Sequence, residues 1–196
     1  MFIYGASGHA KVIIDILRTN NTEITALIDD NPDINSLMGI PVLHASSNLS
    51  PVIIGIGNNS IRKRISEQLQ CEYGTAKHPS AIISHEVVID KGSVIMPGAI
   101  IHTDTHIGKH CIINTGSSID HECIIEDFVH ISPHSTLCGN VRIGEGTWIG
   151  AGTTIIQGIS IGKWSVIGAG SVVVNDIPDN VIAYGNPCRI IKKTDK

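Results

Sequence analysis

Aromatic residues and long apolar runs are scarce in this sequence. Phe, Trp and Tyr together make up 4% of the 196 residues. No apolar run approaches the roughly 20 residues needed to span a bilayer. The opening MFIYGASGHAK also lacks the charged and apolar regions of a secretion signal. We therefore expect a cytoplasmic protein without membrane insertion.

Basic clusters and paired cysteines are missing too. The chain has 14 Lys and Arg against 18 Asp and Glu, a formal net charge of −4, and no basic block that could follow a phosphate backbone. Nucleic acid is therefore not expected as a partner. The five cysteines are scattered without a CxxC pair, which favours reduced thiols over a disulfide framework or a zinc site. We expect no bound metal.

What the sequence does contain is an aliphatic residue at every sixth position through much of its length. From Ile83 to Val173, sixteen consecutive positions of this series are aliphatic and fourteen are Ile, with no insertion. A helix repeats about every 3.6 residues and an ordinary strand about every 2, so neither explains the period. A parallel β-helix does, because each six residues form one short strand and a corner, and the aliphatic side chain points inward.

The residues before this repeat follow a different pattern. Met1–Tyr4 predicts a strand, GASGH at 5–9 a glycine turn, and Ala10–Leu17 an apolar helix. Glu23–Ile28 predicts a second strand, which two aspartates follow. This order is typical of a small Rossmann-like α/β unit.

A third strand and a second helix complete this unit. Val52–Ile56 predicts the strand and Ser60–Leu69 the helix. The helix is expected to bury Ile61, Ile65 and Leu69 and to turn Arg62, Lys63 and Arg64 outward. Lys77-His78-Pro79 interrupts both patterns, so we expect two domains, 1–78 and 79–196.

The glycine turn and the two aspartates are candidate ligand-binding groups. Backbone N–H groups at the start of a helix can approach phosphates, and acidic side chains after the second strand can bind ribose hydroxyls. The glycine signature is shortened to GxxG, however, which departs from a standard dinucleotide site. On these residues alone, a turn that simply requires glycine is an equally good explanation.

Polar chemistry also appears within the repeat, in SSIDHECIIEDFVHIS at 117–132. This stretch places His121 between Asp120 and Glu122, with His130 nine residues later. A carboxylate on one imidazole nitrogen fixes the tautomer and leaves the other nitrogen as a base, and a histidine pKa of about 6.5 suits this task near neutral pH. The alternative is a surface histidine at a turn.

The motifs of both parts together resemble the bacillosamine-type nucleotide-sugar acetyltransferases, which are hexapeptide-repeat enzymes. The motifs are IYGASGH (3–9), IDD (28–30), GIGNNSIRK (55–63), NTGSSIDHEC (114–123), FVHIS (128–132), CGNVRIG (138–144) and YGNPCRII (184–191). The resemblance implies a left-handed β-helix with three repeats per 18-residue coil. It also implies a homotrimer with active sites between subunits. The reaction would transfer acetyl from acetyl-CoA to the 4-amino group of a nucleotide-linked 4-amino-4,6-dideoxy sugar.

The resemblance further implies a role for individual residues. His121 matches the general base and Glu122 the carboxylate beside it, although Asp120 could also orient the ring. His130, Ala151 and Ala169 match the acetyl-CoA site. The nucleotide-sugar pocket is matched by Ser7, Gly8, His9, Asp29, Asp30 and Gly57, and Asn114 receives a weaker polar role there. A UDP-linked sugar is favoured, but the residues themselves do not separate UDP from GDP.

The 18-residue period adds two geometric expectations. His121 and His130 are half a coil apart, so they should lie on opposite sides of one subunit and meet only across a subunit interface. His121 and Gly139 are one coil apart and should stack at one corner, together with Thr103 and His85. There, Gly139 would leave room for a ligand and could offer its backbone N–H to the oxyanion of the reaction.

Three alternatives compete with this interpretation. Relatives with the same plan could O-acetylate sialic acid or a related sugar. A zinc carbonic anhydrase of β-helix type would need a third histidine where Glu126 stands. The chain could also bind nucleotide sugars without catalysis.

We expect direct acetyl transfer without an acyl-enzyme, because Cys111 and Cys123 occupy small inward positions of the repeat.

Overall fold

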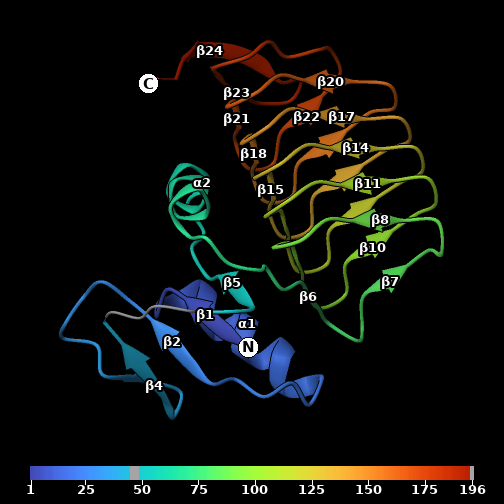
Figure 1. Ribbon diagram of the computed structural model, residues 1–196. Coiled ribbons are helices and arrows are strands. Elements are labelled where there is room, and N and C mark those ends of the chain that lie inside the picture. Colours follow the sequence, from blue (N-terminus) through green and yellow to red (C-terminus); the bar gives the residue numbers. More distant parts are fainter. Residues whose placement is uncertain (45–48, 195–196) are drawn as a thin grey trace.

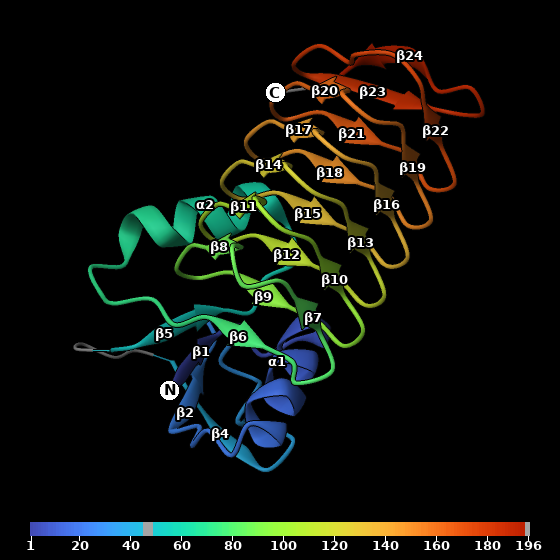
Figure 2. The same cartoon turned by 90° about the vertical axis from the view of Figure 1, so that its right-hand side faces the viewer.

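A computed structural model describes residues 1–44 and 49–194 as an α/β unit beside a long β-helix (Figure 1). The α/β unit lies at one end of the β-helix, and α2 (Asn59–Gln68) lies against the side of the coils. Figure 2 shows the coils stacked one on another, with the C-terminal strands at the far end. Within the described ranges, no helix is long and apolar enough to cross a membrane.

The α/β unit contains the three predicted strands and both predicted helices. Its elements are β1 (Phe2–Tyr4), α1 (Gly8–Thr19), β2 (Ala26–Ile28), β3 (Ser36–Leu37), β4 (Ile40–Leu43), β5 (Val52–Ile54) and α2. The sheet order is β3-β4-β2-β1-β5, and all neighbours are parallel except β3 and β4. The carboxyl ends of β1, β2 and β5 therefore meet at one edge, where ligands bind in such sheets.

Helix α2 departs from its predicted orientation at two residues, Ile61 and Arg62. Ile65 is buried as expected, but Ile61 is 38% exposed and Arg62 only 1% exposed. The expectations that Ile61 is buried and that Arg62 points outward are therefore wrong, whereas Arg64 is exposed as predicted. The physical reason is that the guanidinium finds carbonyl oxygens on the β-helix that an isolated helix does not reveal.

The β-helix is built from sixteen two-residue strands, in each of which the second residue is the repeated aliphatic residue. They are β7 (Ile82–Ile83), β8 (Val88–Ile89), β9 (Val94–Ile95), β10 (Ile100–Ile101), β11 (His106–Ile107), β12 (Ile112–Ile113), β13 (Ser118–Ile119), β14 (Ile124–Ile125), β15 (His130–Ile131), β16 (Thr136–Leu137), β17 (Arg142–Ile143), β18 (Trp148–Ile149), β19 (Thr154–Ile155), β20 (Ser160–Ile161), β21 (Val166–Ile167) and β22 (Val172–Val173). Strand β6 (Ala76–Lys77) precedes them, and β23 (Val181–Tyr184) and β24 (Arg189–Lys193) follow.

These strands form three parallel sheets, one on each side of a triangular prism. The first has the order β24-β23-β21-β18-β15-β12-β9-β6, the second β22-β19-β16-β13-β10-β7 and the third β20-β17-β14-β11-β8. Paired residues are one 18-residue coil apart, as in Ile101↔Ile119. The exception to the parallel pairing is β24, which runs antiparallel to β23 and closes the C-terminal end.

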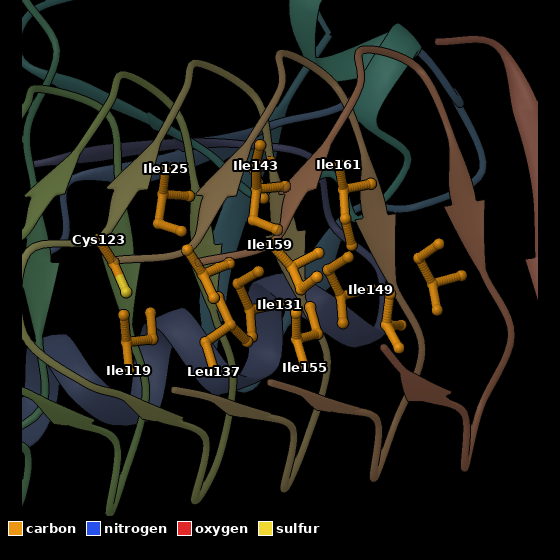
Figure 3. Packing of buried hydrophobic residues seen from close by; sticks show 14 of the residues in the cluster. Ile119, Cys123, Ile125, Ile131, Leu137, Ile143, Ile149, Ile155, Ile159 and Ile161 are labelled. Carbon is orange, nitrogen blue, oxygen red and sulfur yellow. The ribbon is translucent and has the colours of Figure 1, made fainter. Parts of the chain in front are cut away.

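The repeated aliphatic residues fill the interior of the prism. Fourteen of the sixteen are at most 2% exposed, and Figure 3 shows several of them, such as Ile119 and Ile149, pointing toward the axis. Ile83 and Ile89 in the first coil are only partly buried because no full coil covers them. The repeated side chains stack on their equivalents from coil to coil, which fits the absence of any insertion between Ile83 and Val173.

The α/β unit and the β-helix also share a second apolar cluster. Val94, Met96 and Ile112 on the outer face of the first sheet pack with Ile3 and Ile13 of the α/β unit. Strand β6 lies in register with β9 of the β-helix. The boundary at residue 78 stays a prediction, but residues on its N-terminal side already contribute to the prism.

Candidate active site

The structure brings His121 and Glu122 together in the turn between β13 and β14. Nδ1 of His121 lies 2.9 Å from Oε2 of Glu122, and Oδ1 of Asp120 accepts the backbone N–H of His121 at 2.8 Å. Of the two acidic neighbours, Glu122 therefore contacts the ring. A carboxylate on Nδ1 favours the tautomer with the proton there, which leaves Nε2 as an acceptor. Both side chains are at least half exposed in the single chain.

Gly139 lies one coil above His121, as the 18-residue spacing predicts. The corner column is continuous, because Glu122 N–H donates to the Thr103 carbonyl and Asn140 N–H to the His121 carbonyl. A Cβ on Gly139 would lie 2.5 Å from Cε1 of the His121 ring. The space that a side chain of Gly139 would occupy is thus filled by the imidazole of His121, and is not left open for a ligand as we expected. A cavity of about 540 Å³ lies beside the pair, between this coil and the next.

His130 lies at the start of β15 in the first sheet, beside a groove of about 400 Å³. The groove brings together four of the residues singled out in the sequence, namely Asn114, His130, Ala151 and Ala169. Trp148 forms its wall, since its indole stacks on the His130 ring at 5.6 Å between centroids and 4° between planes. We did not predict Trp148, although its outward position in the repeat, just before the inward Ile149, was a usable signal.

Hydrogen bonds define the tautomer of His130. Oδ1 of Asn114 accepts the Thr115 N–H at 2.8 Å, so the amide nitrogen faces Nε2 of His130 at 3.1 Å. Nε2 must then be the acceptor, and the proton resides on Nδ1. Burial, followed by the positive charge of Arg62, lowers the pKa of His130 to about 3, while the backbone of Gly57 opposes this shift. His130 is therefore a neutral ring.

The candidate nucleotide-sugar residues gather at the carboxyl edge of the α/β sheet. Ser7 and Gly8 are exposed at the start of α1, and the Ser7 side chain makes no capping hydrogen bond. Nε2 of His9 is buried without a partner among the described residues. Burial lowers the pKa of His9 to about 4, so this ring is also neutral.

The two aspartates at this edge are already hydrogen-bonded. Asp29 accepts the Ala6 N–H at 2.7 Å through one carboxylate oxygen and the Asn31 N–H at 3.0 Å through the other. Asp30 accepts the Tyr4 hydroxyl at 3.0 Å. Asp29 therefore holds the glycine turn in shape, and its predicted ligand contact stays a prediction.

The two histidines predicted to share a site are far apart within one chain. The cavity beside His121 and the groove beside His130 have no lining residue in common. His121 lies on the corner between the second and third sheets, whereas His130 begins β15 in the first sheet. No group of three metal-ligating side chains suited to an ion is present among the described residues.

Two protein families match separate parts of the chain. Residues 1–69 match the PglD N-terminal domain, and residues 140–175 match the bacterial transferase hexapeptide with six repeats. An uncharacterized protein of Acanthamoeba polyphaga mimivirus is 34% identical over 97 residues, which are 46% of this chain and 20% of the viral protein. The chain thus spans about a fifth of the length of this curated relative.

Solved structures match nearly the whole chain. A mutant of perosamine N-acetyltransferase from Caulobacter crescentus, in complex with CoA and GDP-perosamine, is 35% identical with a TM-score of 0.94, over 98% of this chain and 96% of that one. The acetyltransferase domain of PglB from Neisseria gonorrhoeae, in complex with acetyl coenzyme A, is 35% identical with a TM-score of 0.91, over 97% and 98%.

WeeI from Acinetobacter baumannii is similarly close, with 31% identity and a TM-score of 0.90 over 97% of this chain and 98% of that one. These likenesses confirm the expected fold class, a Rossmann-like α/β unit followed by a left-handed parallel β-helix. They also extend across both parts of the chain, so the sequence resemblance to nucleotide-sugar acetyltransferases is confirmed. The chain belongs to the family of acetyl-CoA-dependent sugar N-acetyltransferases in which a PglD N-terminal domain precedes a hexapeptide-repeat β-helix.

Proposed function

We propose that this protein transfers acetyl from acetyl-CoA to the 4-amino group of a nucleotide-linked 4-amino-4,6-dideoxy sugar. The observation that carries the proposal is the His121–Glu122 pair, in which a carboxylate holds Nδ1 and leaves Nε2 as an exposed base. The Caulobacter relative is described in complex with GDP-perosamine, and the PglB domain in complex with acetyl coenzyme A. UDP-linked sugars remain our first choice of substrate, with GDP-linked sugars as the direct alternative.

The base acts on the attacking amine. Nε2 of His121 accepts the proton as the amine nitrogen bonds to the thioester carbon, and Glu122 stabilises the imidazolium that forms. The carbon–sulfur bond then breaks, and the proton leaves with the CoA thiol. The Gly139 N–H stays our candidate donor to the oxyanion. Because burial raises the pKa of Cys111 and Cys123 to about 12 and about 11, neither thiol is ionised, which supports direct transfer.

The groove beside His130 is the proposed place of the coenzyme. Ala151 and Ala169 follow β18 and β21 at the groove, where small side chains leave the backbone accessible to a pantetheine arm. Nε2 of His130 is already committed to Asn114, and Nδ1 of the same ring is buried. We therefore assign contact with the coenzyme to the face of this ring and to the second N–H of Asn114.

The separation of the two histidines supports a site shared between subunits. Neither corner alone has both the base and the coenzyme groove, so we propose a homotrimer in which the His121 corner of one chain faces the His130 groove of the next. Residues 1–78 would then present the nucleotide sugar. Residues 79–196 would present the coenzyme and the base.

An acetyl-transfer screen by mass spectrometry tests the proposal. Purified protein and acetyl-CoA are offered UDP-4-amino-4,6-dideoxy sugars, a GDP-4-amino sugar and free sialic acid, with a His121→Ala variant as control. Gain of one acetyl group on a 4-amino sugar nucleotide, lost in the variant, supports the proposal and identifies the nucleotide. Acetylation of sialic acid alone would replace it with O-acetylation, and binding without any product would favour a non-catalytic nucleotide-sugar-binding protein.

A further inference from the structure

Arg62 is a buried cation that joins the two parts of the chain. The side chain makes five hydrogen bonds, all to neutral oxygens. Nη1 donates to the carbonyls of Ile56 at 3.0 Å and Gly57 at 3.2 Å, in the loop between β5 and α2. Nε donates to the His110 carbonyl at 2.7 Å, and Nη2 to the Phe128 carbonyl at 2.9 Å, both on the β-helix.

The two β-helix carbonyls that Arg62 reaches belong to one corner column of the prism. His110 and Phe128 are one coil apart, and Asn59 continues the column because its Nδ2 donates to the Gly146 carbonyl at 3.0 Å. Oδ1 of Asn59 in turn accepts from Nη2 of Arg62 at 2.8 Å. One polar cluster on α2 therefore holds three successive turns of the β-helix.

These turns lead directly into the strands of the coenzyme groove. Phe128 comes two residues before His130 at the start of β15, and Gly146 comes two residues before Trp148 at the start of β18. The two rings stack on each other and line the groove. A displacement of Arg62 and Asn59 would therefore shift the backbone that carries His130 and Trp148.

The loop on the other side of Arg62 touches the proposed nucleotide-sugar pocket. The Ile56 side chain packs so closely on the glycine turn that a Cβ on Gly5 would lie 2.6 Å from Cδ1 of Ile56. Gly57 itself is one of the proposed pocket residues. The Ile56–Gly57 loop thus contacts the glycine turn on one side and Arg62 on the other, and the guanidinium fixes it by two hydrogen bonds to its carbonyls.

A buried charge in this position makes the arrangement nearly all-or-none. Desolvation lowers the pKa of Arg62 to about 10, which still leaves the side chain charged at neutral pH. A buried cation is tolerated only while its donors are satisfied, so a partial shift of the loop would leave donors unpaired at considerable cost. The loop and the corner column should therefore move together or not at all.

We propose that Arg62, with Asn59, is a positioning residue that couples binding of the nucleotide sugar to binding of the coenzyme. The role rests on the proposed function only in that it takes the pocket near Gly57 and the groove beside His130 as the two ligand sites. By linkage, a nucleotide that orders the loop must raise the affinity for CoA by the same factor by which CoA raises the affinity for the nucleotide.

Calorimetry on the intact protein tests this role without any turnover. The dissociation constant of CoA is measured alone and in the presence of saturating UDP or GDP. We expect the nucleotide that binds to tighten CoA binding by about five-fold or more in the wild-type protein. In Arg62→Met, both ligands should still bind, but the factor should fall to about one. Arg64→Met on the exposed face of α2 is the matched control and should keep the wild-type factor.

Several outcomes would refute the role. Binding of both ligands to the wild-type protein without coupling would refute it while leaving the proposed function intact. A folded Arg62→Met with wild-type coupling would refute it as well. If Arg62→Met does not fold, Asn59→Ala, which removes the amide donor to the corner column and one guanidinium acceptor, must lower the factor for the role to stand. Failure of the wild-type protein to bind either ligand would refute both proposals together.

Discussion

The imidazole of His121 covers Gly139 so closely that a Cβ on the glycine would lie 2.5 Å from Cε1 and 2.7 Å from Nε2 of the ring. Gly139→Ala should therefore displace the imidazole of His121, our proposed base, without touching Glu122. We expect kcat to fall by about ten-fold or more, with little change in the affinity for CoA. Steady-state kinetics with Thr136→Ala, an exposed truncation in the same coil, as control would check this. Unaltered kcat in Gly139→Ala would show that the ring position is unimportant.

The proposed role of His121 as the base is tested by His121→Ala. Loss of general-base catalysis should lower kcat by about 10²–10⁴-fold and leave CoA binding unchanged. Glu122→Gln keeps a neutral partner near Nδ1 and should cost less than the loss of the ring. His134→Ala, an exposed turn histidine, serves as the control. Turnover near the wild-type level in His121→Ala would exclude this residue as the base.

Gly8 and Gly57 allow a test of the proposed nucleotide-sugar pocket with variants that should not change the stability of the fold. A Cβ on either glycine would have no atom within 4 Å, so the fold does not require glycine at either place. Gly8→Ala and Gly57→Ala should therefore keep the wild-type Tm but weaken nucleotide binding, because a methyl group would occupy the space that a phosphate or sugar approaches. Gly5→Ala is the contrasting variant, since Gly5 has φ 107° and should lose stability. Full nucleotide affinity in both variants would remove these residues from the pocket.

Direct transfer predicts that no thiol carries the acetyl group. Cys138 lines the same cavity as His121, so Cys138→Ser is the informative variant. We expect it to keep turnover within about two- to three-fold of the wild type, because direct transfer does not use the thiol. In an acyl-enzyme mechanism turnover would fall sharply, since a serine is a far weaker acyl acceptor. Intact-protein mass spectrometry after incubation with acetyl-CoA should show no added acetyl group. An acetylated wild-type chain, lost in Cys138→Ser, would replace direct transfer with an acyl-enzyme.

Stability should fall in mild acid because of buried neutral histidines. His110 is 4% exposed, and burial, helped by the charge of Arg62, lowers its pKa to about 4. An unfolded histidine has a pKa of about 6.5, so as pH falls the unfolded chain binds this proton first, and stability is lost between about 6.5 and about 4. Between about pH 7.5 and about pH 5, this one group should cost about 2 kcal/mol of unfolding free energy.

Urea unfolding at the two pH values measures this loss at one fixed protein concentration. His110→Asn should reduce the pH dependence, and Asn is suited to the φ of 53° at this turn. The control His102→Asn, at an exposed position, should leave it unchanged. A pH dependence of the same size in His110→Asn would assign the loss to other groups.

Much of the β-helix could be predicted because its information is local. A six-residue period places each aliphatic residue inward, and three such periods put His121 and Gly139 in one column. The same spacing correctly separated His121 from His130. What it could not predict was the direction of side chains at the corners, and so the ring of His121 was not expected over Gly139.

Arg62 was missed for a different reason. An amphipathic pattern treats every guanidinium as exposed, since charged groups are costly to bury. The oxygens that satisfy it at His110 and Phe128 are 48 and 66 residues away in the chain. Only the packing of α2 on the prism brings them together. The Asn114–His130 contact could not be predicted from the sequence either, because it depends on the orientation of the Asn114 side-chain amide.

The apolar cluster shared by Val94, Met96 and Ile112 with Ile3 and Ile13 limits how this enzyme could be recombined. A fragment cut at residue 78 would leave that outer face of the prism in water, while the detached α/β unit would lose part of its own interior. A foreign α/β unit could therefore replace residues 1–78, our proposed nucleotide-sugar-binding domain, only if the facing residues of the coils were redesigned with it. A change of substrate specificity would instead require substitutions made while this shared apolar cluster is kept intact.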